Sequence, residues 1–398
     1  MDNHLTHDVC IIGGNIAGSY LAYLLASNGV SVVVVEQNRT PGLPLQCAGI
    51  VSQRFSNIVE IDPSIIINRV NTAWLILENG KRVSVSIQDN PYVLDRVKLD
   101  QYFYKKAESA GVRYLVHEKF LTCEKTDECM FINTNRRTIR AKILVGCDGP
   151  NSRVAKLHGI THNIIPAKQI RILYPYPNCS VSMYFKEYWQ NLFGWIIPEG
   201  EGICRIGLGC KKNLKSSFAS FLDEIQADKS HIIEYLGGQI LIGYPKRIAF
   251  DRTILLGDAA GMVKATTGGG INTLLKASTY ASEAILKSLE ENKFSSQFYI
   301  THYQNSRGIR QLKRNILLHY MARLIMINFT QKDYEMCFLL LNQPKTKELL
   351  LKYGDMDFPL RFVLKILMRV DLWKLLFIIV ARVLRKLPKI IRDLVNGG

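Results

Sequence analysis

The chain has 398 residues, a formal net charge of +17 and 47% hydrophobic residues, which allows roughly two to three domains. This composition excludes intrinsic disorder as the main state, and no apolar run reaches the roughly 20 residues of a membrane-spanning helix. The nine cysteines are odd in number and lack C-x-x-C spacing, which argues against a disulfide framework or a zinc ribbon and predicts an intracellular location.

The N-terminal segment, residues 8–36, predicts a strand, a tight turn, a helix and a second strand. Asp8–Ile12 is a short apolar run, and Val30–Val35 is a β-branched run of the kind found in buried parallel strands. Between them, Gly13–Gly18 is a glycine-containing turn, and Gly29 ends the helix. This order is the first unit of a doubly wound α/β sheet.

The turn is close to the dinucleotide-binding pattern G-x-G-x-x-G, which needs an acid about 20 residues further on. Gly13 and Gly18 fit, whereas Asn15 replaces the middle glycine and narrows the space for a pyrophosphate. Glu36 ends the second strand, where a carboxylate can bind the ribose of an adenosine while the helix N-terminus faces the pyrophosphate. Taken alone, the turn also fits a tight connection in any α/β fold.

The rest of the chain predicts a second sheet that interrupts the first domain twice. Alternating apolar and polar residues mark this sheet, whereas the chain beyond about residue 297 is helical in composition. We therefore expect an α/β protein with a Rossmann-like domain, an antiparallel-sheet substrate domain and a basic C-terminal helical region. Their predicted bounds are 1–69, 96–164 and 248–297 for the first, 70–95 and 165–247 for the second, and 298–398 for the third.

Two later segments decide which cofactor the first domain binds. Ile143–Arg153 reads ILVGCDGPNSR, and Thr253–Ile271 reads TILLGDAAGMVKATTGGGI. In the second, Asp258 follows a strand, and Gly268–Gly270 lets backbone N–H groups approach a flat ring or a phosphate. Together with the turn, these segments resemble the three fingerprints of the FAD-dependent oxidoreductases of the p-hydroxybenzoate-hydroxylase type. The resemblance spans residues 9–271 and implies FAD, not a nicotinamide alone.

This resemblance also implies which residues hold FAD. Glu36 would bind the adenosine ribose, Arg96 would lie near the pyrophosphate and Asp258 would bind the ribityl chain. Asp148 and Gly149 would lie beside the cofactor. The full set of implied cofactor contacts is Gly13, Asn15, Ala17, Gly18, Glu36, Cys47, Ala48, Ile50, Arg96, Leu121, Asp258, Gly261, Gly269, Gly270 and Ile271.

Two further segments resemble the geranylgeranyl reductase family, which includes archaeal digeranylgeranylglycerophospholipid reductases. Leu45–Ser52 reads LQCAGIVS and carries Cys47 in the family's C-x-G loop. Phe193–Gly209 reads FGWIIPEGEGICRIGLG and matches the family's Y-x-W-x-F-P motif followed by G-x-G. Phe193 and Ile197 replace its Tyr and Phe, and Gln190 stands where a proline is usual.

The second motif also has a physical interpretation of its own. Phe193, Trp195 and Ile197 alternate, so a strand would place them on one face, next to Pro198. Such a wall suits a long hydrocarbon without hydrogen-bonding groups, and we predict these four residues to bind substrate. The alternative is that Trp195 is simply part of the core of the second sheet.

The resemblance implies an enzyme that saturates C=C bonds of geranylgeranyl chains, in prenyl ether lipids or geranylgeranyl diphosphate, by hydride transfer from reduced FAD. Cys47 is the implied catalytic residue, either in proton delivery or in tuning the flavin, although a free cysteine is often only a small buried side chain. Ferredoxin, NADPH and a quinol all remain open as electron donor. No histidine spacing indicates a metal.

Other functions fit the same fingerprints. Trp195–Pro198 partly matches the halogenase pattern G-W-x-W-x-I-P, so a flavin monooxygenase or halogenase is one alternative. A flavoprotein that passes electrons to a membrane quinone is another. Asn15 leaves a third, a membrane-peripheral binding protein that has lost FAD.

The positive charge is concentrated near the C-terminus. Residues 301–398 hold 18 Lys and Arg against 7 Asp and Glu, and therefore carry +11 of the +17. Within them, Leu360–Val395 combines apolar residues at helical spacing with regularly placed basic residues, as interfacial membrane helices do. Because nothing in the chain reads bases, we expect no nucleic acid partner. We predict a cytoplasmic protein held peripherally on an anionic membrane, the alternative being a solvated helical tail.

Overall fold

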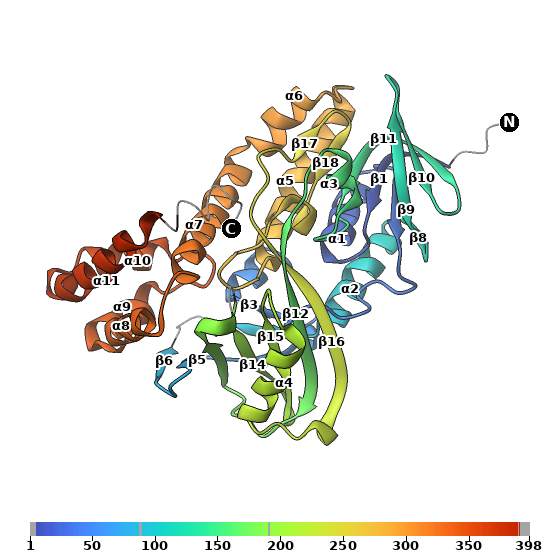
Figure 1. The fold of residues 1–398 in the computed structure, drawn as a ribbon. Coiled ribbons are helices and arrows are strands. Elements are labelled where there is room, and N and C mark those ends of the chain that lie inside the picture. The colour runs from blue at the N-terminus through green and yellow to red at the C-terminus, as the bar shows by residue number, and fades with distance from the viewer. Residues whose placement is uncertain (1–4, 87–89, 190–191, 389, 391–398) are drawn as a thin grey trace.

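The computed structural model describes residues 5–86, 90–189, 192–388 and 390. Its largest sheet has eight strands, and β17, β18, β11, β1, β2 and β8 lie side by side in that order (Figure 1). Strands β9 and β10 extend it from β11. The bounds are β1 Leu5–Ile12, β2 Val32–Glu36, β8 Arg113–Val116, β9 Phe120–Lys125, β10 Met130–Thr134, β11 Thr138–Gly146, β17 Ala249–Phe250 and β18 Thr253–Leu255.

The centre of this sheet is parallel, as the β-branched sequence predicts. β1 pairs in parallel with both β2 and β11. On the outer sides, β2 pairs in parallel with β8, and β11 pairs in parallel with β18. Residues Val32–Val35 are at most 2% exposed, because both faces of a parallel sheet are covered. The principal helices of this part are α1 Ile16–Ala26, α2 Arg96–Ser109, α3 Arg153–Leu157 and α5 Ile271–Glu290.

The second sheet has seven strands in the order β16, β12, β15, β14, β13, β5 and β6. Its pairs are antiparallel except β13 with β5, which run parallel. Helix α4, Leu214–Glu224, packs on one face through Phe218, Phe221 and Leu222. The bounds are β5 Thr72–Leu77, β6 Arg82–Ser86, β12 Asn163–Leu173, β13 Ser180–Phe185, β14 Gly194–Gly200, β15 Ile203–Gly209 and β16 Ile232–Ile242.

A small third sheet contains β3, β7 and β4 in that order. It contributes the strand that leads directly into α2 and the strand that follows the Cys47 loop. The bounds are β3 Ile50–Val51, β4 Ile66–Arg69 and β7 Tyr92–Leu94. These sheets give the mixed, doubly wound α/β fold expected from the sequence, whereas the domain bounds given above remain a prediction.

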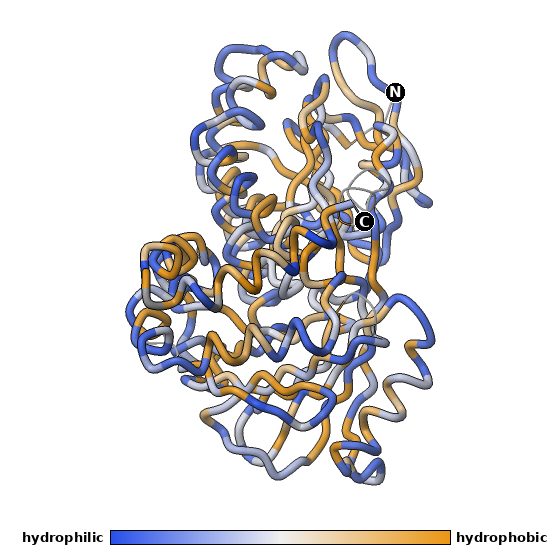
Figure 2. Tube along the Cα trace, turned by 60° about the vertical axis from the view of Figure 1, so that its left-hand side comes forward, coloured by the Kyte–Doolittle hydropathy of each residue, from blue (hydrophilic) through white to orange (hydrophobic). Residues whose placement is uncertain are grey.

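The C-terminal part is helical and lies to one side of the sheets (Figure 1). Hydrophobic stretches run through the interior strands and also along outlying segments of the chain (Figure 2). No helix among the described residues is both long and apolar enough to cross a membrane. The bounds are α6 Ser296–Tyr299, α7 Arg307–Met326, α8 Gln331–Asn342, α9 Pro344–Tyr353, α10 Leu360–Leu367 and α11 Trp373–Arg385.

Candidate functional site

The glycine turn connects β1 to α1 with no room for side chains at its two ends. Gly13 has φ of +101°, and a Cβ there would overlap the carbonyl of Cys147 on the neighbouring strand end. A Cβ at Gly18 would overlap the carbonyl oxygen of Gly13. Ala17, the other residue predicted in this turn, is buried at the start of α1. The turn therefore lets the start of α1 pack tightly against the sheet edge.

Asn15 does not need the conformational freedom of the glycine that it replaces. It precedes α1 with φ of −77° and ψ of −174°, an extended conformation open to any residue. Its exposed side chain accepts a hydrogen bond from the backbone N–H of Gly42, with Oδ1 3.0 Å from the nitrogen. The substitution thus ties the turn to the loop after β2 and leaves the backbone of the turn intact.

Glu36 lies at the end of β2, beside the turn, as predicted. Its side chain is buried, and Oε2 accepts a hydrogen bond of 2.7 Å from the N–H of Gly14. Its other oxygen accepts one of 2.8 Å from the N–H of Asn38. The carboxylate is therefore held rigidly at the point where α/β folds of this kind bind a ribose.

Arg96, at the start of α2, has two acidic residues and a thiol around it. Its guanidinium pairs with Asp100 at 3.0 Å, hydrogen-bonds Cys47 and interacts electrostatically with Asp258. Burial raises the pKa of Asp258 to about 6, and Arg96 offsets part of that rise. The structure thus brings together three residues that the sequence predicted separately, Cys47, Arg96 and Asp258.

Asp100 is a member of this cluster that the sequence analysis missed. Its Oδ1 accepts a hydrogen bond of 2.6 Å from the backbone N–H of Ile16 in the first turn of α1. Burial raises the pKa of Asp100, and Arg96 partly offsets this. The spacing of Arg96 and Asp100, four residues apart on a helix, was the available signal.

The Cys47 loop runs alongside Arg96. The thiol sulfur accepts a hydrogen bond of 3.3 Å from the N–H of Gly49, and Cys47 and Ala48 are only partly buried. Ile50 begins β3 directly after this loop. A partly buried thiol at this place is accessible to a ligand.

A third segment reaches the same region from β18. Gly261 has φ of +71°, and Gly270 caps α5 before Ile271. Lys264 donates its backbone N–H to Gly269, at 2.9 Å, which closes the loop between them. The predicted glycines thus form a compact loop that leads into the N-terminus of a long helix.

The C-terminal region contacts this loop through a buried ion pair that the sequence did not indicate. Lys264 Nζ lies 2.5 Å from Asp357, in the segment between α9 and α10. Asp357 also accepts hydrogen bonds from Ser52 at 2.5 Å and from Asn272 at 2.9 Å. Although burial opposes it, Lys264 holds the pKa of Asp357 at about 2. We call the segment Gly354–Pro359 the strap.

Leu121 and Asp148, also predicted to lie at the cofactor, have quite different surroundings. Leu121 lies on β9, and its side chain is 46% exposed. Asp148 accepts hydrogen bonds from Ser152 Oγ at 2.5 Å and from the N–H of Arg153 at 2.6 Å, and so caps α3. The structure therefore gives Asp148 a local structural role, and the contacts of both residues with the cofactor remain predictions.

The aromatic motif forms part of the core of the second sheet. Phe193, Trp195 and Ile197 are all under 10% exposed and belong to one apolar cluster. The indole N–H of Trp195 donates to Gln169 at 2.9 Å, and the absent side chain of Gly207 leaves room for its ring. Gln190, the position that departs from the family's proline, lies outside the described residues.

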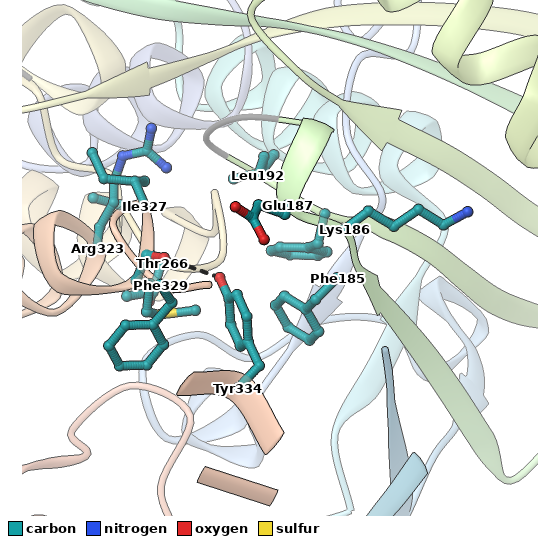
Figure 3. A pocket seen from close by; sticks show the side chains of 12 residues that line it. Phe185, Lys186, Glu187, Leu192, Thr266, Arg323, Ile327, Phe329 and Tyr334 are labelled. Carbon is teal, nitrogen blue, oxygen red and sulfur yellow. Dashed lines mark hydrogen bonds between the residues drawn. The ribbon is translucent and has the colours of Figure 1, made fainter. Parts of the chain in front are cut away.

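A cavity that is partly open to solvent adjoins Phe193, and Figure 3 shows the side chains that line it. Its lining includes Leu192 and Phe193, which directly precede β14, whereas Trp195, Ile197 and Pro198 are not among its lining residues. The opposite wall comes from α7, α8 and the loop between them, with Phe329, Tyr334 and a buried Arg323. The full lining is Phe185, Lys186, Glu187, Leu192, Phe193, Ala265, Thr266, Arg323, Met326, Ile327, Phe329 and Tyr334.

The residues around Arg96 fit a dinucleotide cofactor. The buried Nε of Arg96 has no hydrogen-bond partner among the described residues, and neither has the buried Oδ1 of Asn272 at the start of α5. Such buried groups ordinarily have a partner, and a phosphate oxygen and a ring N–H are partners of the required kinds. No cluster of metal-ligating side chains is present within the described part of the chain.

Comparison with known proteins identifies relatives over most of the chain. Residues 11–67 match the family model of the NAD(P)-binding Rossmann-like domain. Digeranylgeranylglycerophospholipid reductase 2 of Methanosphaera stadtmanae is 24% identical over 82% of this chain and 92% of its own length. Digeranylgeranylglycerophospholipid reductase 1 of the same organism is 28% identical over 83% of this chain and 87% of its own length.

Solved structures show the same fold. A geranylgeranyl bacteriochlorophyll reductase-like protein from Thermoplasma acidophilum has a TM-score of 0.82 at 21% identity, covering 94% of this chain and all of that one. A mutant of the halogenase PltM in complex with FAD has a TM-score of 0.65 at 16% identity, covering 88% of this chain and 84% of that one. The chain is therefore similar to digeranylgeranylglycerophospholipid reductases over most of its length and shares the fold of a geranylgeranyl reductase-like protein and of an FAD-binding halogenase, which confirms the resemblance predicted from its sequence.

Proposed function

We propose that this protein is an FAD-dependent reductase that saturates C=C double bonds in the geranylgeranyl chains of a prenylated lipid. The observation that carries the proposal is the meeting of Cys47, Arg96 and Asp258 at a buried Arg96 Nε that has no hydrogen-bond partner among the described residues. The chain also forms a cavity whose lining includes several aromatic side chains. The names of the relatives and their coverage of the chain support the same activity.

FAD supplies the hydride when bound and reduced, and the chain's own residues orient it. We assign Glu36 to the adenosine ribose, Arg96 to the pyrophosphate and Asp258 to the ribityl chain. Glu36 is held in place by two backbone N–H groups, so its position is fixed before any ligand binds. Arg96 contacts Asp100 and Cys47, and its buried Nε, which has no partner among the described residues, can donate to a phosphate.

We assign the cavity to the hydrocarbon and Cys47 to its proton. An isolated alkene has no hydrogen-bonding group, so we assign its binding to the aromatic side chains of the lining, Phe185, Phe193 and Tyr334. Figure 3 shows Phe185 and Tyr334 in this lining. We assign Cys47 to proton delivery, because its thiol is partly exposed and lies beside the Arg96 guanidinium.

The exposed face of α10 and α11 is the proposed membrane contact. Leu360, Val363, Leu364 and Leu367 form one stripe of α10, and Trp373, Phe377, Val380 and Leu384 form one stripe of α11; each of these side chains is at least 45% exposed. Arg361, Lys374 and Arg385 are exposed near the stripes. Apolar stripes flanked by basic residues bind anionic lipid surfaces. Residues 389 and 391–395 of the predicted amphipathic stretch lie outside the described residues.

Lipid reduction with a chemical donor tests the activity. Purified protein is reduced with dithionite and given a geranylgeranylated ether phospholipid or geranylgeranyl diphosphate, and the product is analysed by mass spectrometry. We expect a gain of about two mass units for each double bond saturated. Cys47→Ala should lower the rate about 100-fold, within the range for loss of a general acid, and Cys179→Ala on an exposed turn should leave it unchanged. No mass gain with reduced FAD bound would overturn the proposal.

A further inference from the structure

Arg205 is a buried guanidinium that the proposed chemistry does not use. It lies on β15, an interior strand of the second sheet between β12 and β14, and only 2% of its surface is exposed. One nitrogen, Nη1, donates to the carbonyl of Ala48 at 2.7 Å and to the carbonyl of Leu94 at 3.1 Å. A single side chain of the second sheet therefore binds two separate segments of the Arg96 cluster.

Both carbonyls belong to segments that carry residues of the proposed site. Ala48 directly follows Cys47, and Leu94 lies two residues before Arg96. The two segments are also joined to each other, because the N–H of Leu94 donates to the carbonyl of Gly49 at 2.9 Å. Arg205 thus sits at the junction that sets how the Cys47 thiol lies relative to the Arg96 guanidinium.

Glu199 fixes the orientation of Arg205. Arg205 Nε lies 2.5 Å from Glu199 Oε1, and Arg171 pairs with the same carboxylate at 2.8 Å from the more exposed side. Although burial alone would raise it, Arg171 and Arg205 hold the pKa of Glu199 below its ordinary value. A buried carboxylate between two guanidinium groups keeps its charge and so holds the planar fork of Arg205 in one position.

Gly49 makes the approach of Arg205 possible. It has φ of +74°, and a Cβ at this position would overlap Arg205 Nη1 and crowd the carbonyl of Leu94. The glycine of the C-x-G loop therefore provides the space that the guanidinium occupies. The loop and the buried charge fit together as one unit.

We infer that Arg205 is a positioning residue that, held by Glu199, fixes the Cys47 loop and the Arg96 segment in one relative position. It acts through the carbonyls of Ala48 and Leu94 and itself contacts neither cofactor nor hydrocarbon. The inference deepens the proposed function and rests on it only for the catalytic consequence. The positional claim stands on the geometry of the chain alone.

The accessibility of the Cys47 thiol reports that position directly. We propose to alkylate the protein with iodoacetamide and to measure the rate at Cys47 by peptide mass spectrometry, with the exposed Cys179 as internal reference. Arg205→Gln removes the hydrogen bonds from the guanidinium to the carbonyls of Ala48 and Leu94. We therefore expect Cys47 to react about fivefold faster or more relative to Cys179. Arg171→Gln, which removes the other partner of Glu199, should leave the ratio unchanged.

Arg205→Lys provides a second variant if Arg205→Gln does not fold. Lysine keeps the charge opposite Glu199 but lacks the planar fork, so we expect a smaller increase in the same direction. In the lipid assay, either folded variant should lower kcat roughly tenfold or more and change KM about twofold or less. An unchanged Cys47 ratio in the folded variants, or an equal increase in Arg171→Gln, would overturn the inference. A changed ratio in a protein that reduces no lipid would refute only the proposed function.

Discussion

The central strands and the last two helices have similarly apolar sequences but opposite surroundings. In β2, Val32–Val35 are at most 2% exposed, because β1 and β8 flank the strand and helices cover the sheet. In α11, Trp373 is 55% and Phe377 is 75% exposed. An apolar pattern thus identifies a face that can be buried, but only the fold shows whether the described chain supplies the partner that buries it.

The inner side of α11 shows that this helix is nevertheless firmly attached. Arg382 and Lys386 both pair with Asp333 on α8, whose side chain is 3% exposed. Although burial opposes it, these cations hold the pKa of Asp333 well below its usual range. Two of the basic residues predicted to bind a membrane therefore form ion pairs within the protein. The helix presents its apolar stripe outward.

The largest expected effect concerns that stripe. Changing Trp373 and Phe377 together to Glu should weaken binding to vesicles of phosphatidylcholine and phosphatidylglycerol by about 100-fold or more, because each lost apolar side chain removes about 1.5–3 kcal/mol. The unfolding midpoint should change little, since both side chains are exposed and their one hydrogen bond among the described residues runs from the indole N–H of Trp373 to the carbonyl of Leu367. Cosedimentation measures the binding, and Tyr235→Glu, at a residue 74% exposed on β16, is the matched control. Equal binding of the two variants would mean that the stripe does not touch lipid.

The next largest effect concerns the strap, Gly354–Pro359, which joins the C-terminal helices to the loop after β18. Asp357→Asn removes the buried partner of Lys264 and should lower the free energy of unfolding by about 3–5 kcal/mol. Arg54→Gln breaks the more exposed pair with Asp355 in the same segment and should cost about 1 kcal/mol or less. Urea unfolding measures both. Similar losses in the two variants would contradict the distinction between buried and exposed contacts.

The pH dependence of the free energy of unfolding tests the surroundings of Asp258, in the buried region around the first sheet. Burial raises its pKa from 3.8 to about 6, so the folded, FAD-free protein holds the protonated form more tightly than the unfolded chain does. This contribution to stability is complete below pH 3.8 and is lost as the pH rises through 6. Between pH 4 and 7 the free energy of unfolding should fall by on the order of 3 kcal/mol more in the wild type than in Asp258→Asn. Urea unfolding across this pH range measures it. Parallel pH profiles would show that Asp258 is not the titrating group.

The smallest effect concerns a single surface charge. Lys374→Gln, on α11, should weaken binding to the same anionic vesicles about fivefold, since a basic residue near such a surface contributes about 1 kcal/mol. Lys229→Gln, at an exposed lysine beside β16, should have no effect. The difference between the two should disappear at high salt, where surface charges are screened. A difference that persists at high salt would rule out an electrostatic origin.

The parts of the fold and site that local pattern encodes were predictable. The glycine turn, Glu36 at a strand end and Asp258 after β18 follow from spacing along the chain, and the parallel sheet follows from its β-branched runs. The parallel pairing of β13 with β5 could not be predicted, because an alternating pattern is the same for parallel and antiparallel neighbours. The expected aromatic wall also proved to be only partly a cavity wall, since Trp195 packs into the core.

The contacts that were missed join single residues far apart in the sequence. Lys264 and Asp357 are separated by 93 residues, and Arg205 reaches Ala48 across 157. The residues next to each partner in the sequence do not mark it as special, so no short stretch of a single sequence indicates that the two are in contact. The chain beyond residue 297 was predicted only to be helical, and the contribution of Tyr334 on α8 and Phe329 in the preceding loop to the cavity depends on how α7 and α8 pack.

Anaerobic reoxidation of the reduced protein by lipid tests the central claim most directly. Protein reduced with one equivalent of dithionite, without oxygen or quinone, is mixed with vesicles that contain a geranylgeranylated ether phospholipid. The account predicts that the absorbance of oxidised FAD returns and that the saturated lipid formed matches it in amount. If the absorbance returns only when oxygen or a quinone is added, and the lipid keeps its double bonds, the protein is not a prenyl-chain reductase.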